Sequence, residues 1–283
     1  MTTFKPLTNR ASSKAHGDDT TLTRFHFSKS DTPKARSTRR QPRLPGYENT
    51  FVREGRPKFM RSVKKPEDLA HLLVSGHSNA KIGRDVRVGR LKGFHIYTLS
   101  LPERMTCPTS CKHWEDCYGN NMPFAKRIDP SSKTFLPRLS QEIDELMRKH
   151  RGKVLIRLHA LGDFYSETYV QFWHNQLRKH STLHLFGYTA RVPGTPIGDA
   201  VGATHLAWGE RFMVRISDGG GLNMCTVSIG GRDDAPAGSV ICPEQLGVEH
   251  KRINPKTGTP YAMLCATCGI CWSTPTNVAF MEH

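Results

Sequence analysis

The fold is decided by the stretch Lys153-Val154-Leu155-Ile156-Arg157-Leu158-His159-Ala160-Leu161-Gly162-Asp163-Phe164-Tyr165. Six of its first nine residues are apolar, which predicts a buried strand. The run ends at a glycine and an aspartate, and an amphipathic helix is predicted to begin near Ser166. The residues that recur at helical spacing in this helix are Tyr169, Phe172, Trp173 and Leu177. A buried strand followed at once by such a helix is typical of a βαβ unit.

The same alternation extends in both directions along the chain. The other strand candidates are residues 95–101, 183–189 and 212–216. A second amphipathic helix is predicted where Phe135, Leu139, Ile143 and Leu146 recur, and a short helix over residues 65–73. Roughly five or six such units fit into residues 90–280, whereas a full eight-stranded barrel usually needs ~250 residues. The sequence therefore predicts an α/β protein built on a partial or short (βα) barrel.

The composition excludes several classes of protein. The 283 residues include 41 Lys and Arg against 25 Asp and Glu, a formal charge of +16, and 37% of them are hydrophobic. No apolar run reaches the ~18 residues that a membrane-spanning helix needs. The first ten residues also lack the apolar stretch of a secretory signal. We therefore expect a soluble, basic protein of the cytoplasm that does not bind membranes.

Most of the excess charge lies near the start of the chain. Residues 1–66 hold 16 Lys and Arg against 5 Asp and Glu, and residues 67–283 hold 25 against 20. The first segment has no apolar periodicity, so it cannot bury enough surface to offset its ordering entropy. We predict a disordered basic arm over residues 1–66 and a folded catalytic domain over residues 67–283. The arm either binds nucleic acid through its phosphates, DNA rather than RNA, or is a solubilising tail.

Seven of the eight cysteines fall into two groups with metal-ligand spacing. Cys107, Cys111 and Cys117 occupy one loop directly after a predicted strand. Thiols are kept reduced in the cytoplasm, so such clusters hold metal there more often than disulfides. His113 can complete a closed zinc site, whereas three thiolates and an open position suit an iron–sulfur cluster.

The second group is a Cys-x2-Cys-x2-Cys run close to the end of the chain. Its members are Cys265, Cys268 and Cys271, and Cys242 is the natural fourth ligand. Four thiolates hold either zinc or an iron–sulfur cluster. Cys225 has no partner at ligand spacing, so we interpret it as a buried free thiol.

Acidic and glycine residues follow the predicted strands, where parallel α/β sheets place their sites. Asp163 and Asp218 are candidate catalytic residues, because a carboxylate can orient an amine, act as a general base or act as a nucleophile. The alternative for Asp163 is a turn or helix-capping aspartate. Gly162, Asp163 and Asn120 are candidate cofactor-binding residues, and nearby Lys126 and Arg127 are expected to add positive charge.

These residues carry a resemblance to an uncharacterised cysteine-rich family of phages and plasmids. It covers roughly residues 80–283 and rests on residues 96–127, residues 157–166, the strand end at 187–191 and the closing cysteine run. A phage origin implies the host cytoplasm as the location of the protein.

The order of parts is also similar to radical S-adenosylmethionine (SAM) enzymes. A strand leads into a three-cysteine loop ending in Cys117-Tyr118, and a second strand ends in Gly162-Asp163-Phe164. The resemblance implies that Cys107, Cys111 and Cys117 bind a [4Fe–4S] cluster whose open iron binds SAM, and that Asp163 faces SAM. The spacing here is Cys-x3-Cys-x5-Cys, whereas that superfamily uses Cys-x3-Cys-x2-Cys.

A second resemblance is to guanine transglycosylases that act on tRNA or phage DNA. These are (βα) barrels with a cysteine-rich zinc site, which the Cys242, Cys265, Cys268 and Cys271 set resembles in kind. This likeness implies that one of Asp163 and Asp218 is a covalent nucleophile and the other a general acid or base. The leading hypothesis is a nucleic-acid-modifying enzyme with radical-SAM-like chemistry. The alternatives are a base-exchanging transferase and a zinc-stabilised, non-catalytic DNA- or RNA-binding protein.

Overall fold

The computed structural model describes residues 53–219, 224–246, 249–253, 258 and 260–282. The first 52 residues of the predicted basic arm therefore lie outside the described residues. Residues 53–66 are predicted to be part of the same arm because of their charge, but they pack on the folded domain. The Glu54 N–H donates to the Met105 carbonyl (3.2 Å), and the Ser62 hydroxyl accepts from Arg127 (2.8 Å). The folded part of the chain thus begins before residue 67.

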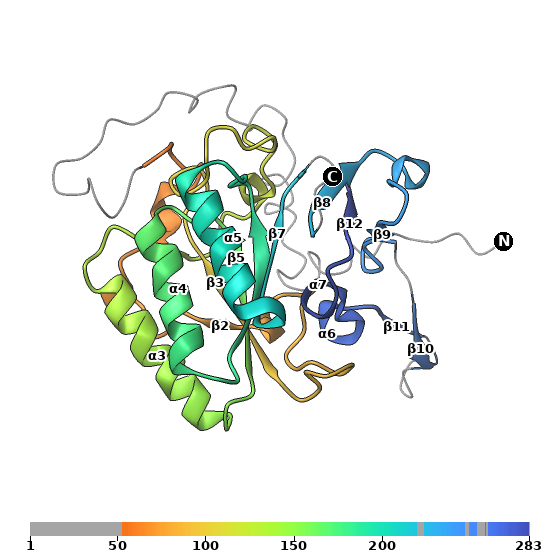
Figure 1. Ribbon diagram of the computed structural model, residues 1–283, viewed down its shortest axis with the longest axis horizontal. Helices are drawn as coiled ribbons and strands as arrows, with labels where there is room; N and C mark the ends of the chain where they lie inside the picture. Colours follow the sequence, from red (N-terminus) through yellow and green to blue (C-terminus); the bar gives the residue numbers. More distant parts are fainter. Residues whose placement is uncertain (1–52, 220–223, 247–248, 254–257, 259, 283) are drawn as a thin grey trace.

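A five-stranded sheet with the order β2-β3-β5-β6-β7 forms the centre of the domain (Figure 1). Its strands are β2 (Val74–Ser75), β3 (His95–Ser100), β5 (Val154–Leu161), β6 (His184–Thr189) and β7 (Phe212–Ile216). The last four strands are parallel, and only β2 pairs antiparallel. They are joined by α3 (Phe135–Lys149), α4 (Glu167–Lys179) and α5 (Pro196–Trp208), which all cover one face of the sheet. The prediction of repeated βαβ units is confirmed.

The predicted barrel is not found among the described residues. Past β7 the strands are short: β8 (Thr226–Ile229), β9 (Val240–Ile241) and β12 (Val278–Met281) form a separate parallel sheet with the order β8-β12-β9. A single bridge from Ile216 to Cys225 links it to the main sheet. Helices α6 (Cys265–Cys268) and α7 (Ile270–Ser273) have one turn each, so no full helical crossover continues the pattern.

Two further strand pairs lie outside these sheets. Strand β1 (Val63–Lys64) pairs with β4 (Arg127–Ile128), and β10 (Glu249–Ile253) pairs with β11 (Pro260–Ala262). The helix predicted over residues 65–73 is only a 3₁₀ turn at Pro66–Asp68. The reason is tertiary: the N–H groups of Leu72 and Leu73 donate to the Glu142 carboxylate of α3 instead of to helical carbonyls.

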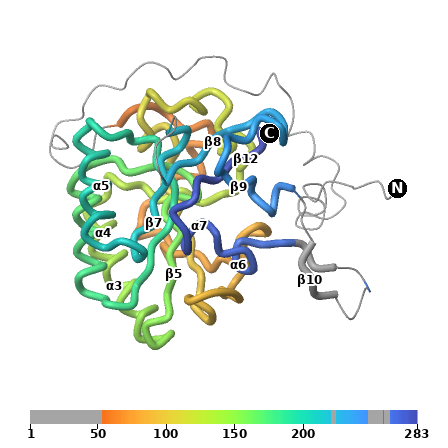
Figure 2. Tube along the Cα trace, turned by 45° about the vertical axis from the view of Figure 1, so that its right-hand side comes forward, coloured from red at the N-terminus to blue at the C-terminus, as the bar shows by residue number. Residues whose placement is uncertain are grey.

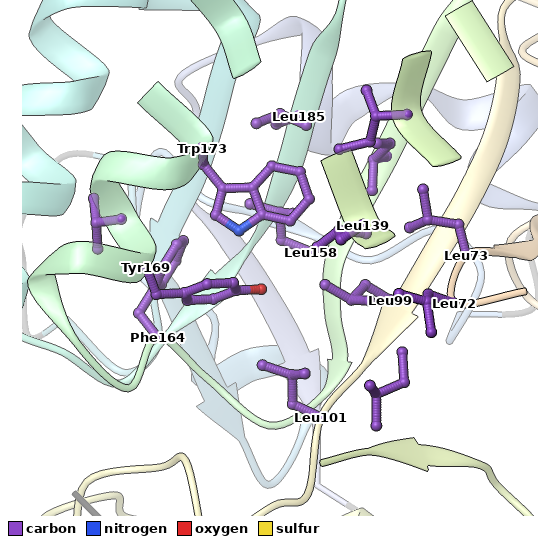
Figure 3. Packing of buried hydrophobic residues seen from close by; sticks show 14 of the residues in the cluster. Leu72, Leu73, Leu99, Leu101, Leu139, Leu158, Phe164, Tyr169, Trp173 and Leu185 are labelled. Atoms are coloured by element: carbon purple, nitrogen blue, oxygen red, sulfur yellow. The ribbon is translucent and has the colours of Figure 1, made fainter. Parts of the chain in front are cut away.

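The larger hydrophobic core lies between the sheet and helices α3 to α5 (Figure 3). Trp173 and Tyr169 of α4 meet leucines of β3, β5 and β6 there, and the two rings are 6.0 Å apart between centroids. The Ser166 hydroxyl caps α4 by accepting from the Tyr169 N–H. In α3, the predicted Phe135, Leu139 and Ile143 are buried, and Met147 rather than Leu146 completes the stripe.

A second core covers the opposite face of the sheet. Ile96, Leu155, Phe186 and Met213 point to this side and pack against Ala266 and Trp272. The Phe186 and Trp272 rings meet edge to face, with 4.9 Å between centroids. Figures 1 and 2 accordingly show α6 and α7 on the side of the sheet away from α3 to α5. Within the described ranges, no helix has the length and apolar character needed to cross a membrane.

Candidate functional site

The structure brings the first cysteine group and the strand-end residues to one edge of the main sheet. The cysteine loop follows β3, Asp163 follows β5, Arg191 follows β6 and Asp218 follows β7. Because these four strands are parallel, their carboxyl ends lie at the same edge. The groups are close enough for their charges to interact: Cys107 with Asp163, and Cys111 with Asp163, Asp218 and Arg191.

The three thiols of this loop are neighbours in an enclosed setting. Burial raises the pKa of all three thiols, and that of Cys117 rises to about 11. The other two thiols add to the rise of the pKa of Cys107, and Cys111 adds to that of Cys117. Within the described ranges, no three His, Cys, Asp or Glu side chains are already arranged to hold a metal ion. The loop therefore gathers the thiols without placing them at ligand geometry.

A buried ion pair anchors the end of the cysteine loop. Arg127 is fully buried and donates to both carboxylate oxygens of Glu103, at 2.6 and 3.0 Å. It also donates to the carbonyls of Gly119, Met122 and Ala125 at 2.9–3.0 Å. The prediction that Arg127 adds free positive charge is wrong, because Glu103 neutralises it. Sequence reasoning missed Glu103, since a partner 24 residues away has no local signature.

Asp163 is buried, and both of its oxygens are occupied. Oδ1 accepts from the Thr189 hydroxyl (2.6 Å) and the Phe164 N–H (2.7 Å), and Oδ2 accepts from the Ala190 N–H (2.7 Å). Burial raises the pKa of Asp163, while nearby Arg191 and these hydrogen bonds act in the opposite direction. Arg191 in turn donates to the Phe164 and Thr106 carbonyls at 2.8 Å. The carboxylate thus ties the ends of β5 and β6 together.

Gly162 allows this close approach of strand ends. Its φ is +85°, a conformation that side chains disfavour, and an added Cβ would lie 2.7 Å from Leu101 Cβ and from Thr106 Oγ1. Asn120 lies in the 3₁₀ helix Tyr118–Asn121 and is buried. Its amide donates to the Glu115 carbonyl (2.8 Å), and its Oδ1 accepts no hydrogen bond within the described part of the chain. That oxygen is buried.

Asp218 is paired with the histidine of the cysteine loop. Its Oδ2 is 2.8 Å from His113 Nε2, and its Oδ1 accepts from the Ser228 N–H at 2.8 Å. The Ser228 hydroxyl is 3.0 Å from the same His113 nitrogen. Both partners use Nε2, so these residues do not form a relay of the Ser–His–Asp type, which uses both ring nitrogens. In the neutral ring, a hydrogen bond from Nε2–H to Asp218 leaves Nδ1 with its lone pair, as in metal-ligating histidines.

The second cysteine group lines one pocket. Cys242 follows β9, and Cys265, Cys268 and Cys271 lie on α6 and α7; all four border this pocket together with Trp272 and Val278. Burial raises the pKa of Cys242 to about 11 and that of Cys265 to about 12. The Tyr188 hydroxyl donates to Cys271 Sγ at 3.0 Å. Cys225 is fully buried and outside both groups, as the sequence predicts.

The buried His159 of β5 makes the fold sensitive to acid. Its Nε2 is 3.1 Å from the Tyr169 hydroxyl, and burial, followed by the charge of Arg157, lowers the pKa of His159 to about 3. In the unfolded chain a histidine takes up a proton below about pH 6.5. The stability that depends on the neutral ring is therefore present above pH 6.5 and is lost as the pH falls towards 3. Between pH 7.5 and 5.0 we expect a loss of about 2 kcal/mol from this residue.

Urea unfolding of the wild type and of His159→Gln at these two pH values measures this effect. The variant should lose about 2 kcal/mol less stability than the wild type over the same interval. Equal losses in the two proteins would show that another group causes the pH dependence.

Comparison with known proteins places the chain in a family. The model of the family described as gene product 88 matches residues 71–274, which include both cysteine groups. The chain belongs to the gene product 88 family. It is 28% identical to the gene 88 protein of Mycobacterium phage D29 over 141 residues, 47% of this chain, and spans 56% of that protein's length. No solved structure matches. The resemblance to a phage family is confirmed. The description of the family states no reaction, so the chemistry of this chain is inferred from its site residues.

Proposed function

We propose that this member of the gene product 88 family is a nucleic-acid-modifying enzyme with radical-SAM-like chemistry. In this proposal Cys107, Cys111 and Cys117 hold a [4Fe–4S] cluster that leaves one iron open for SAM. The observation that carries it is the convergence of the three thiols with Asp163 and Arg191 at the carboxyl edge of four parallel strands. Such an edge is where open α/β sheets bind ligands.

The donor set fits this group. Iron–sulfur clusters are held by cysteine thiolates, and three thiolates leave one iron without a protein ligand. The thiols must draw together on binding, because they are not at ligand geometry in the structure. The loop has no helix or strand between β3 and the 3₁₀ helix that begins at Tyr118. Its turns are held by local bonds such as Cys111 N–H to the Pro108 carbonyl, and these turns would have to adjust when the thiols draw together. The Glu103–Arg127 pair keeps the end of the loop in place meanwhile.

When bound, the cluster with SAM supplies radical chemistry at one carbon of the cofactor. The residues of this chain position the strand ends around the bound group. Asp163 and Arg191 hold the ends of β5 and β6 by hydrogen bonds, and Gly162 lets the β5 end lie against Leu101. The unpartnered Oδ1 of Asn120 is an acceptor for an amine or hydroxyl of a bound cofactor. Asp163 acts by orienting the strand ends, because both of its oxygens are already bonded.

Nucleic acid as the substrate is supported by the charge. The chain carries a formal charge of +16, and residues 1–66 carry 16 Lys and Arg against 5 Asp and Glu. A basic segment of this kind binds phosphates through the release of counterions, and such binding weakens with added salt.

A closed zinc site is the second candidate, and one observation favours it. His113 is bonded to Asp218 through Nε2, so its Nδ1 is free to act as a fourth ligand beside three thiolates. Three cysteines and one histidine form a structural zinc site. The protein would then be a zinc-stabilised DNA- or RNA-binding protein without catalysis. Base exchange by an aspartate nucleophile has less support, because Asp163 and Asp218 are both engaged in hydrogen bonds.

The metal content tests the proposal directly. Protein purified without oxygen is analysed for iron, zinc and acid-labile sulfide, and incubated with SAM and a reductant. We expect about four iron and four sulfide per chain in the first site and measurable cleavage of SAM. Cys107→Ala should remove this iron and abolish the cleavage. The matched control is Cys225→Ala, which removes a thiol that belongs to neither group.

Two results would contradict the proposal. One is stoichiometric zinc without iron or sulfide, which supports the closed site with His113. The other is SAM cleavage by Cys107→Ala at the wild-type rate.

A further inference from the structure

Arg157 occupies the middle of the sheet, on the face turned towards the second cysteine group. It pairs in register with Thr98 of β3 and Phe186 of β6. Side chains alternate between the two faces of a strand, so Arg157 shares a face with Leu155, which belongs to the core under α6 and α7. Its guanidinium lies over the Tyr188 ring, 5.0 Å from the centroid.

Arg157 is unusual because no group in the described part of the chain accepts a hydrogen bond from its guanidinium. It donates no hydrogen bond and forms no ion pair within the described part of the chain, and its buried Nε has no partner. A guanidinium has five N–H donors in a planar fork. Arg127, by comparison, donates six hydrogen bonds and pairs with Glu103. A buried N–H donor without an acceptor costs free energy. A guanidinium without hydrogen-bond partners therefore indicates that a ligand supplies the acceptors.

The surroundings of Arg157 leave it cationic and accessible. The groups whose charges interact with it most are Tyr188, Tyr118, Cys265 and Cys271, and none of them is a carboxylate. Burial opposes the charge, but these neighbours raise the pKa of Arg157 overall. Arg157 itself is only partly buried.

Tyr118 shows that solvent reaches this region, because its side chain is 48% exposed. Tyr118 directly follows Cys117, and it interacts with Arg157 as well as with Cys107 and Cys117. Arg157 therefore adjoins the proposed active site.

We propose that Arg157 is the anchor for a phosphate group of the substrate. The planar fork of arginine binds the oxygens of phosphate in pairs, through charge-assisted hydrogen bonds. A phosphate bound there lies between the two cysteine groups, next to the thiols of the first. The choice of phosphate rests on the proposed function, since nucleotides and nucleic acids carry this group and the chain is strongly basic.

Binding measurements on the full-length protein test the anchor. The probes are inorganic phosphate, a nucleoside, its monophosphate, a short single-stranded oligonucleotide and acetate, titrated calorimetrically at constant salt. The variants are Arg157→Gln and Arg157→Lys. The matched control is Arg148→Gln, which removes the same charge from an exposed position on α3. Thermal unfolding of each variant reports whether it is folded.

We expect Arg157→Gln to weaken the binding of the nucleoside monophosphate about 10- to 150-fold, because hydrogen bonds to a charged group are lost. Arg157→Lys should retain part of the affinity as a point charge without the fork. The nucleoside alone should bind equally to all variants, and Arg148→Gln should behave as the wild type. If Arg157→Gln does not fold, Arg157→Lys takes its place: weaker binding of the monophosphate than in the wild type supports the anchor, and equal binding overturns it.

The outcomes separate this anchor from the proposed function. Arg157-dependent binding of inorganic phosphate and monophosphate, but not of the oligonucleotide, supports the anchor and makes the substrate a small phosphorylated molecule. The same binding in Cys107→Ala shows that the anchor does not need the metal. Equal binding of every phosphate probe to Arg157→Gln and the wild type overturns the anchor. So does a loss of affinity in Arg157→Gln that is seen with acetate and with none of the phosphate probes.

Discussion

Glu103→Gln is expected to lower the free energy of unfolding by about 3–5 kcal/mol, the cost of leaving a buried charge without its partner. Glu103 and Arg127 are 1% and 0% exposed, and Arg127 Nε lies 2.6 Å from Glu103 Oε2. Glutamine keeps the shape of the side chain but removes the negative charge. It also turns one acceptor into a donor that faces the guanidinium. The carbonyls of Gly119 and Met122, which Arg127 holds, would be loosened with it.

Urea unfolding at neutral pH measures this loss as a change of the transition midpoint. The control is Asp116→Asn, an exposed acid of the same loop, which should change stability by less than about 0.5 kcal/mol. The double variant Glu103→Leu with Arg127→Met should recover much of the loss, because an apolar pair leaves no charge unpaired. A change below about 1 kcal/mol in Glu103→Gln would contradict the assigned role. Iron binding by the folded fraction shows how far the loop depends on this pair.

Asp163→Asn is expected to cost about 2–4 kcal/mol, although the two side chains have the same shape. Asp163 uses both oxygens as acceptors, towards the N–H groups of Phe164 and Ala190. Either orientation of an amide sets its NH₂ group against one of these N–H donors. The variant also removes the negative charge beside Arg191. The ends of β5 and β6 then separate, and the cysteine loop loses a neighbour.

The matched control is Asp233→Asn, an exposed aspartate of the 3₁₀ helix Arg232–Asp234, which should leave stability unchanged. Unfolding by urea gives the stability, and labelled guanine exchange into nucleic acid gives the activity of a transglycosylase. A nucleophilic Asp163 would behave differently: Asp163→Asn would abolish exchange while the protein kept its wild-type stability. That pair of results would contradict the positioning role and make base exchange the leading function.

Local sequence patterns predicted the structure correctly wherever residues that are close in sequence are also close in space. The apolar run of β5, the Ser166 cap and the stripe of α4 lie within about 25 residues, so spacing alone predicts them. The Cys-x2-Cys-x2-Cys run is equally local, and its three members border one pocket with Cys242. Helix α3 follows its predicted stripe apart from its last position, where Met147 is buried and Leu146 is only partly buried.

Tertiary contacts decided the features that spacing does not encode. The predicted helix over residues 65–73 is lost because the Glu142 carboxylate takes the N–H groups of Leu72 and Leu73. Among the described residues the barrel is replaced by an open sheet, because β8, β9 and β12 are short and the helices before β12, α6 and α7, have one turn each. The contrast between Arg127 and Arg157 is of the same kind. Both are strand arginines, and only the folded chain provides Glu103 to Arg127, whereas Arg157 finds no acceptor among the described residues.

The sequence by itself therefore determined the βαβ elements, the two cysteine groups and their order along the chain, because these depend on residues close together in sequence. The tertiary structure alone decided which charged groups are neutralised and which remain available. Glu103, Thr189 and Ser228 find their partners 10–26 residues away, and such pairs leave no periodic trace in the sequence. Asp163 is bound on both oxygens for this reason, because the carboxyl ends of parallel strands meet only when the sheet forms.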